Sequence, residues 1–197
     1  MQSRSVEFAK KFGVVFEVRS SFNNNPGTIV KEETDSMEAV VVRGVSIEKN
    51  QAKVTITHVP DRPGTAAKIF NAVANAGLII DMIVQNVSVQ GSTDISFTMS
   101  KDELPKAQAR LAPVVKEVGA SEMLAQDGIA KLSIVGIGMR SHSGVAAKLF
   151  DALSSGGINI QMISTSEIKT SVVIDEKYME LAVRALHKAF ELEQPGA

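Results

Sequence analysis

The stretch Gly64-Thr65-Ala66-Ala67-Lys68-Ile69-Phe70 returns later in the chain as Gly144-Val145-Ala146-Ala147-Lys148-Leu149-Phe150. Upstream, residues 53–56 match residues 131–134 at an offset of 78 positions, whereas Gly64 and Gly144 are 80 positions apart. Downstream, the match continues at four positions: Gly77, Ile80, Met82 and Ile83 against Gly157, Ile160, Met162 and Ile163. Ordered matches over about thirty positions indicate an internal repeat. The chain is therefore predicted to contain two copies of one small fold.

Each copy is predicted to consist of a strand, a helix, two strands and a second helix. In the first copy, Val54 and Ile56 alternate with polar residues, which is the period of a half-buried strand. After Gly64, apolar residues recur at helical spacing, at Ala67, Ile69, Phe70, Val73 and Ala74. Strands are predicted over 78–84 and around Phe97, a helix over 102–118, and a weak closing strand near 122–126.

The second copy lacks room for its own closing strand. It runs from Lys131 to Phe190, and its last helix is predicted over 176–191, shortly before the sequence stops. The apolar segment 39–48 has no partner in the first copy, and we expect it to complete the second sheet. The expected domains are therefore 49–127, and 128–192 completed by strand 39–48. Residues 1–37 carry too few elements for a core of their own and are expected to belong to a larger domain.

Composition excludes several classes of function. The 197 residues are 44% hydrophobic and 22% charged, which is ordinary for a globular protein. The net charge of −1 and the absence of Trp argue against a nucleic-acid partner. Cysteine is absent, which excludes thiolate metal sites and Cys nucleophiles. No apolar run is long enough to cross a membrane, so we expect no membrane partner and a cytoplasmic location.

Several strings taken together resemble the tandem ACT domains in the regulatory region of aspartate kinases. They are the Pro-Asp-Arg-Pro-Gly loop at 60–64 and the segments 81–88, 138–145 and 159–168, while residues 4–28 are similar to the end of that family's catalytic amino-acid-kinase domain. The resemblance implies an α+β fold made of two ferredoxin-like βαββαβ ACT domains, with helices on one face of antiparallel sheets. Residues 1–37 would then be the end of the catalytic domain plus a linker.

The resemblance also implies a regulatory role without catalysis by this chain alone. The family's phosphate-handling Lys-Phe-Gly-Gly segment has no match, since residues 11–14 read Lys-Phe-Gly-Val, and a P-loop and a Rossmann fingerprint are both missing. The implied ligands are L-threonine, L-lysine or both, which would feedback-inhibit the first step of the aspartate-family pathway. The implied partners are a second copy, paired through ACT domains, and a catalytic aspartate kinase domain or subunit. No cofactor or metal is expected.

The loop before the first helix is the candidate effector site. A free amino acid presents a carboxylate, which unpaired amides at a helix start can bind, and an ammonium, which needs acceptors. Gly64, Thr65 and Ala66 form such a start, Asp61 offers an acceptor, and Gln85 offers both a donor and an acceptor. The resemblance adds Ser88, and it adds Asn159 and Ile160 from a neighbouring ACT unit.

Simpler structural roles are possible for the same residues. Asp61 could cap the helix, Thr65 could be an ordinary first-turn residue, Gln85 could be a solvated strand residue, and Asn159 could belong to a turn. The whole chain could likewise be a dimerisation subunit without a ligand. An active enzyme is the least favoured reading, because the phosphate-binding machinery is missing from this sequence.

Overall fold

The computed structural model describes residues 2–31, 41–86, 90–136, 139 and 142–192. The chain divides into two units, Met1–Ala39 and Val40–Ala197. The first unit holds helix α1 (Ser3–Phe12) and a hairpin of β1 (Phe16–Val18) and β2 (Thr28–Val30). Most of its large apolar side chains are exposed, above all Phe22 at 96%. The described part of this unit therefore does not bury a core of its own.

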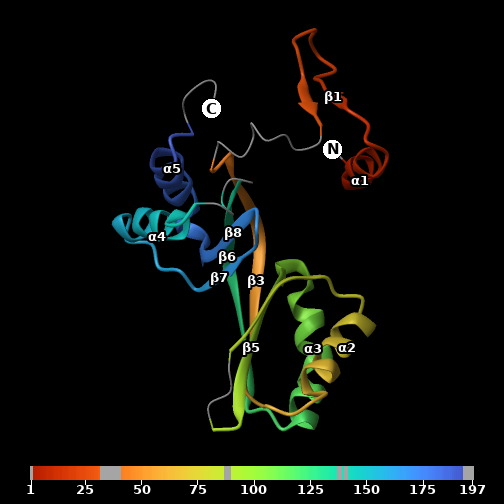
Figure 1. The fold of residues 1–197 in the computed structure, drawn as a ribbon. Helices are drawn as coiled ribbons and strands as arrows, with labels where there is room; N and C mark the ends of the chain where they lie inside the picture. Colours follow the sequence, from red (N-terminus) through yellow and green to blue (C-terminus); the bar gives the residue numbers. More distant parts are fainter. Residues whose placement is uncertain (1, 32–40, 87–89, 137–138, 140–141, 193–197) are drawn as a thin grey trace. The chain divides into compact units, whose positions relative to one another are not determined.

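The second unit is built on one antiparallel sheet of six strands, in the order β4-β5-β3-β6-β8-β7. The strands are β3 (Gly44–Pro60), β4 (Ile80–Gln85), β5 (Ser92–Ser100), β6 (Glu122–Val135), β7 (Met162–Thr165) and β8 (Lys169–Asp175). The helices are α2 (Thr65–Asn75), α3 (Leu104–Val118), α4 (Val145–Ser155) and α5 (Met179–Ala189), with short 3₁₀ turns η2 (Lys101–Glu103) and η4 (Glu176–Tyr178). Figure 1 shows α2 and α3 on one side of the long strands and α4 and α5 on the other. The predicted α+β class, with helices covering antiparallel strands, is confirmed.

Strands β3 and β6 run through both halves of this sheet. Residues 53–57 pair with residues 122–126, and residues 44–48 pair with residues 131–135. The sequence predicted separate strands over 39–48 and around Val54, but both belong to the single strand β3. Likewise, the strand predicted near 122–126 and the one that opens the second copy belong to the single strand β6. The reason is that the irregularity between Glu48 and Lys53 is absorbed as a bulge rather than a turn. Of the predicted strand 39–48, the part from Gly44 is observed as strand, and residues 39 and 40 lie outside the described residues.

Each half packs its helices onto alternate residues of its strands. In the first half, Val54, Ile56 and Phe97 are fully buried against α2 and α3, as predicted from the alternation. In the second half, Leu132 and Ile134 pack in the same way against α4 and α5. A third buried cluster, away from both helix pairs, joins the halves through Met82, Ile129, Met162 and Val173.

The predicted apolar face of α2 is partly wrong. Ile69 and Val73 are buried and Phe70 packs against the core, but Ala67 and Ala74 are exposed. Residues two positions apart on a helix are separated by roughly 200°, so Ala67 cannot share the face of Ile69. Ala66, Ala72 and Ala76 complete the buried face instead. A methyl side chain is too small to decide the orientation of a helix.

Helices α2 and α4 begin in the same way. Gly64 and Gly144 directly precede the first residue of α2 and of α4. Their φ angles are +93° and +89°, which residues with a Cβ rarely adopt. A Cβ built on Gly64 would meet no atom within 4 Å, so backbone conformation, and not lack of space, requires glycine there. Among the described residues, no helix is long and apolar enough to cross a membrane.

Gly64→Ala is expected to lower the free energy of unfolding by about 1–2 kcal/mol, because the left-handed region is strained for a residue with a Cβ. Urea denaturation followed by circular dichroism measures this. Gly44→Ala is the matched control, since Gly44 also has open space at its Cβ position but does not have a positive φ. Equal losses in the two variants would contradict the role of the backbone angle.

Leu111→Ala should lower the free energy of unfolding by about 2–5 kcal/mol, because Leu111 lies on α3 and is fully buried. The same exchange at Leu181, which lies on α5 and is 44% exposed, should cost below about 1 kcal/mol. Both variants are measured by urea denaturation. A loss at Leu181 as large as that at Leu111 would show that the burial pattern is wrong.

Candidate functional site

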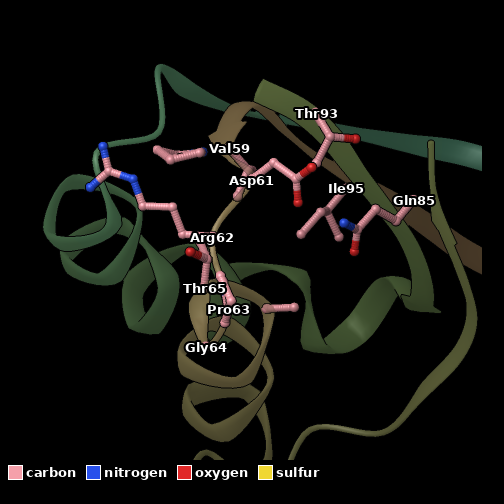
Figure 2. A pocket seen from close by; sticks show the side chains of 11 residues that line it. Val59, Asp61, Arg62, Pro63, Gly64, Thr65, Gln85, Thr93 and Ile95 are labelled. Atoms are coloured by element: carbon pink, nitrogen blue, oxygen red, sulfur yellow. The ribbon is translucent and has the colours of Figure 1, made fainter. Parts of the chain in front are cut away.

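A cavity of about 330 Å³ lies where β3 ends and α2 begins (Figure 2). Its wall consists of the β3–α2 loop, the first turn of α2, the end of β4 and the start of β5. The lining residues are Val59, Pro60, Asp61, Arg62, Pro63, Gly64, Thr65, Ala66, Gln85, Thr93 and Ile95. The structure therefore brings together Asp61, Gly64, Thr65, Ala66 and Gln85, which the sequence had placed in one site.

The start of α2 presents amide groups to this cavity. The amide of Thr65 donates to the carbonyl of Arg62 at 3.2 Å, and the amide of Lys68 donates to the carbonyl of Gly64 at 3.0 Å. Within the described residues, the amides of Gly64 and Ala66 have no acceptor, and no side chain caps the helix. Unsatisfied amides at a helix N-terminus carry partial positive charge and favour an anion. This end of the cavity is suited to a carboxylate.

Asp61 lies in the loop that leads to the helix. Its backbone amide donates to the carbonyl of Gly91 at 3.0 Å, which ties the loop to the β4–β5 turn. The carboxylate does not cap α2, so the capping role considered for Asp61 is not observed. In Figure 2 this carboxylate points into the cavity, whereas the side chain of Arg62 points away from it. An exposed carboxylate aimed at the cavity is suited to bind an ammonium group.

Gln85 forms the opposite wall. It is the last residue of β4, pairs with Ile95 in β5, and extends its amide toward Asp61 across the cavity (Figure 2). Gln85 is exposed to solvent, so its donor and acceptor are available to a ligand. Buried Ile95 lies between the two polar side chains and supplies an apolar floor.

Sequence reasoning missed Thr93 and Ile95 as parts of the wall. Thr93 is buried, and its hydroxyl donates to the carbonyl of Asn86 at 2.7 Å, which fixes the chain just after Gln85. For this segment the sequence predicted only a strand around Phe97. The period-two alternation places Thr93 and Ile95 on one face of β5, which was the available signal.

Asn159 and Ile160 do not line this cavity in the single chain. Ser88 lies outside the described residues. Asn159 is exposed and Ile160 is half-buried against the core of the second half, just before β7. Both were expected to reach the site from a neighbouring ACT unit, so their role stays a prediction. The described residues contain no group of three or more acidic or histidine side chains that could hold a metal ion.

The chain matches known proteins over its full length. Models of the ACT domain match residues 53–115 and residues 132–190. The aspartate kinase of Pseudomonas fluorescens is 52% identical over all of this chain, which spans 48% of that relative. The chain therefore covers about half the length of the curated relatives it matches.

Two solved structures connect these matches to the fold. The ligand-free regulatory subunit of aspartate kinase from Thermus thermophilus is 43% identical, with a TM-score of 0.72 over 76% of this chain and 99% of that subunit. Aspartate kinase from Synechocystis is 37% identical, with a TM-score of 0.78 over 100% of this chain and 36% of that enzyme. The two ACT domains recognised in the sequence are confirmed. The chain belongs to the aspartate kinase family and represents its tandem-ACT regulatory part.

Proposed function

We propose that this chain senses a small free amino acid, L-threonine or L-lysine or both, and through it feedback-inhibits the first step of the aspartate-family pathway. The observation that carries the proposal is the convergence of free amides at Gly64 and Ala66, a carboxylate at Asp61 and an amide side chain at Gln85 on one cavity. The ligand carboxylate would bind the amides, its ammonium would bind Asp61, and Gln85 would bind a side-chain hydroxyl.

L-Threonine suits this cavity better than L-lysine. Lysine needs an acidic partner for its distal ammonium, for which Asp81 and Glu167 are the two candidates. The carboxylate of Asp81 already binds Lys131, and Asp81 is not part of the cavity wall. Threonine needs only a hydroxyl partner, which Gln85 provides. Lysine stays the second candidate, at this cavity or at another interface.

The cavity is open to solvent on one side, and its closure would require another ACT domain. Asn159 and Ile160 lie far from it along the chain and do not line it. In the proposed assembly, these two residues come from a second copy, so that the ligand lies between the two chains of a homodimer. A ligand that binds this closed arrangement better shifts the equilibrium by its differential affinity. Couplings of this kind are about 1–3 kcal/mol, or roughly 5–150-fold.

The proposed domain organisation follows from the strand pairing. Residues 49–127 form the first ACT domain, and residues 128–192 form the second, with segment 39–48 contributing its last strand through the pairs from Gly44 to Glu48. The first domain is thus an insertion in the second. Residues 1–37 are proposed to be the end of the catalytic amino-acid-kinase domain, because their exposed phenylalanine and valine side chains would be covered by the remainder of that domain.

The alternative role is dimerisation without a ligand. It would fit the same sheet and the same pairing of ACT domains, but it gives no reason for an uncapped helix start facing an aimed carboxylate. The sensing role explains both features.

Calorimetric titration of the chain with L-threonine should show saturable binding. Asp61→Ala and Gln85→Ala should each weaken it at least about 10-fold, because each removes a charged or polar partner of the ligand. Asp151→Ala and Gln108→Ala are matched controls, since both residues are exposed on helices away from the cavity, and they should bind as the parent chain does. Absence of heat with both threonine and lysine would instead favour the dimerisation role.

The exposed apolar side chains of residues 1–31 should make the isolated chain bind a hydrophobic fluorescent dye. Phe22→Ser should reduce this signal and leave the unfolding midpoint of Val40–Ala197 unchanged, because Phe22 is 96% exposed in the first unit. Adding a catalytic half from a relative should lower the dye signal of the parent chain. Dye binding that does not change under either treatment would contradict the proposed covering of this unit.

A further inference from the structure

Two lysines occupy equivalent positions in the two copies of the repeat. Lys53 lies in β3 and Lys131 in β6, at the matching start of each copy. Their partners are also equivalent, because Asp81 and Gln161 are aligned just before the matched methionines Met82 and Met162. The repeat has therefore kept a lysine and a polar partner at the same two places.

Each lysine reaches the copy to which it does not belong. The ammonium of Lys131 binds the carboxylate of Asp81, in β4 of the first copy. Lys53 donates to Oε1 of Gln161, just before β7 of the second copy, at 2.7 Å. The two contacts are thus reciprocal, and they flank the buried cluster of Met82 and Met162 that joins the halves.

The two contacts differ in charge. The Lys131 side chain is only 2% exposed and also binds Glu48 at 2.7 Å, so a buried ammonium lies between two carboxylates. Burial alone would lower the pKa of the Lys131 ammonium. Its hydrogen bonds to Asp81 and Glu48 and the negative charges of these residues together have a larger effect, so the pKa of Lys131 is raised. Lys53 meets a neutral amide and makes no ion pair within the described residues; burial lowers its pKa.

Both contacts end on segments to which the proposed function assigns a part in effector binding. Asp81 and Gln85 lie on the same short strand β4, four residues apart. Gln161 directly follows Asn159 and Ile160, and its backbone amide donates to the carbonyl of Val173 at 2.8 Å. Each lysine therefore holds, from the opposite copy, a segment that is expected to contact the effector.

We infer that Lys131 and Lys53 are positioning residues, which hold β4 and the segment 159–165 from the opposite ACT domain and so make the two domains of one chain respond as a unit. The effect on ligand affinity rests on the function proposed above, whereas the cross-domain contacts can be tested without a ligand. A lysine with only a local structural role would affect its own strand and the strands beside it. A positioning lysine affects the other domain.

Hydrogen–deuterium exchange of the full chain tests this in the absence of a ligand. Lys131→Met keeps the length of the side chain and removes its charge, and it should speed exchange over residues 80–85 by about tenfold or more, because Asp81 loses its buried partner. Lys53→Met should do the same over residues 159–165. The matched control is Lys68→Met, which breaks an exposed ion pair with Glu117 within one half and should change neither segment.

Further variants and a titration separate the possible outcomes. If Lys131→Met fails to fold, Asp81→Asn keeps the lysine and the side-chain shape and should still speed exchange over 80–85, while Lys131→Arg should restore protection. In calorimetry, Lys131→Met should weaken threonine binding about 5-fold or more, and Lys68→Met should not.

Unchanged exchange over 80–85 in both Lys131→Met and Asp81→Asn would overturn the inference, as would a change confined to β6 and β8. A parent chain that binds no amino acid would refute the proposed function, and the exchange result would still decide the role of the two lysines. Normal threonine binding by Lys131→Met, in a parent chain that does bind, would refute the link to the site.

Discussion

The antiparallel pairing of β3 with β6 is the constraint on which the rest of the second unit depends. The two strands stay paired from Gly44 opposite Val135 to Thr57 opposite Glu122, and each contributes to both halves of the sheet. A slip of β3 by one residue would turn Val54 away from the first core and Val45 away from the second at the same time. Both cores therefore depend on one set of hydrogen bonds. So does the position at which β3 ends and the loop of the candidate site begins.

Duplication explains the shared backbone of the two halves, and local substitutions explain their different chemistry. Gly64 and Gly144 give α2 and α4 the same entry, yet Thr65 in the first copy is Val145 in the second. The pair Lys131–Asp81 is ionic, whereas Lys53 meets the neutral Gln161. A repeat can keep the geometry that its core requires while the polar positions between the halves diverge, because the helices of each half pack on apolar residues of the strands.

Much of the fold could be predicted from the periodicity of apolar residues. The predictions that were wrong concern features that leave no periodic pattern in the sequence. Alternation at Val54 and Ile56 and the glycine at 64 identified the strand and the start of the helix. The continuity of β3 and β6 was missed because a bulge near Asn50 resembles a strand end in sequence. In the site, side-chain chemistry indicated Asp61 and Gln85, whereas Ile95 joins the wall through its pairing with Gln85 in β4 and Thr93 through its pairing with Val59 in β3. The contacts of Lys131 depend on tertiary structure alone, and no local pattern could have predicted them.

The site and the contacts between the halves lie on the same few strands, which bears on how a bound ligand could act at a distance. The backbone of Gln85 is part of β4, which is hydrogen-bonded on one side to β5 and held by Lys131 from the other domain. A ligand that draws Gln85 toward Asp61 therefore acts on a strand whose position the second domain also determines. Since free-energy coupling between two sites is reciprocal, a ligand whose affinity depended on the second domain would shift the equilibrium of that domain by the same free energy. The buried ammonium is well placed to carry that coupling, because a charge with two carboxylate partners cannot lose one of them without a large change in free energy.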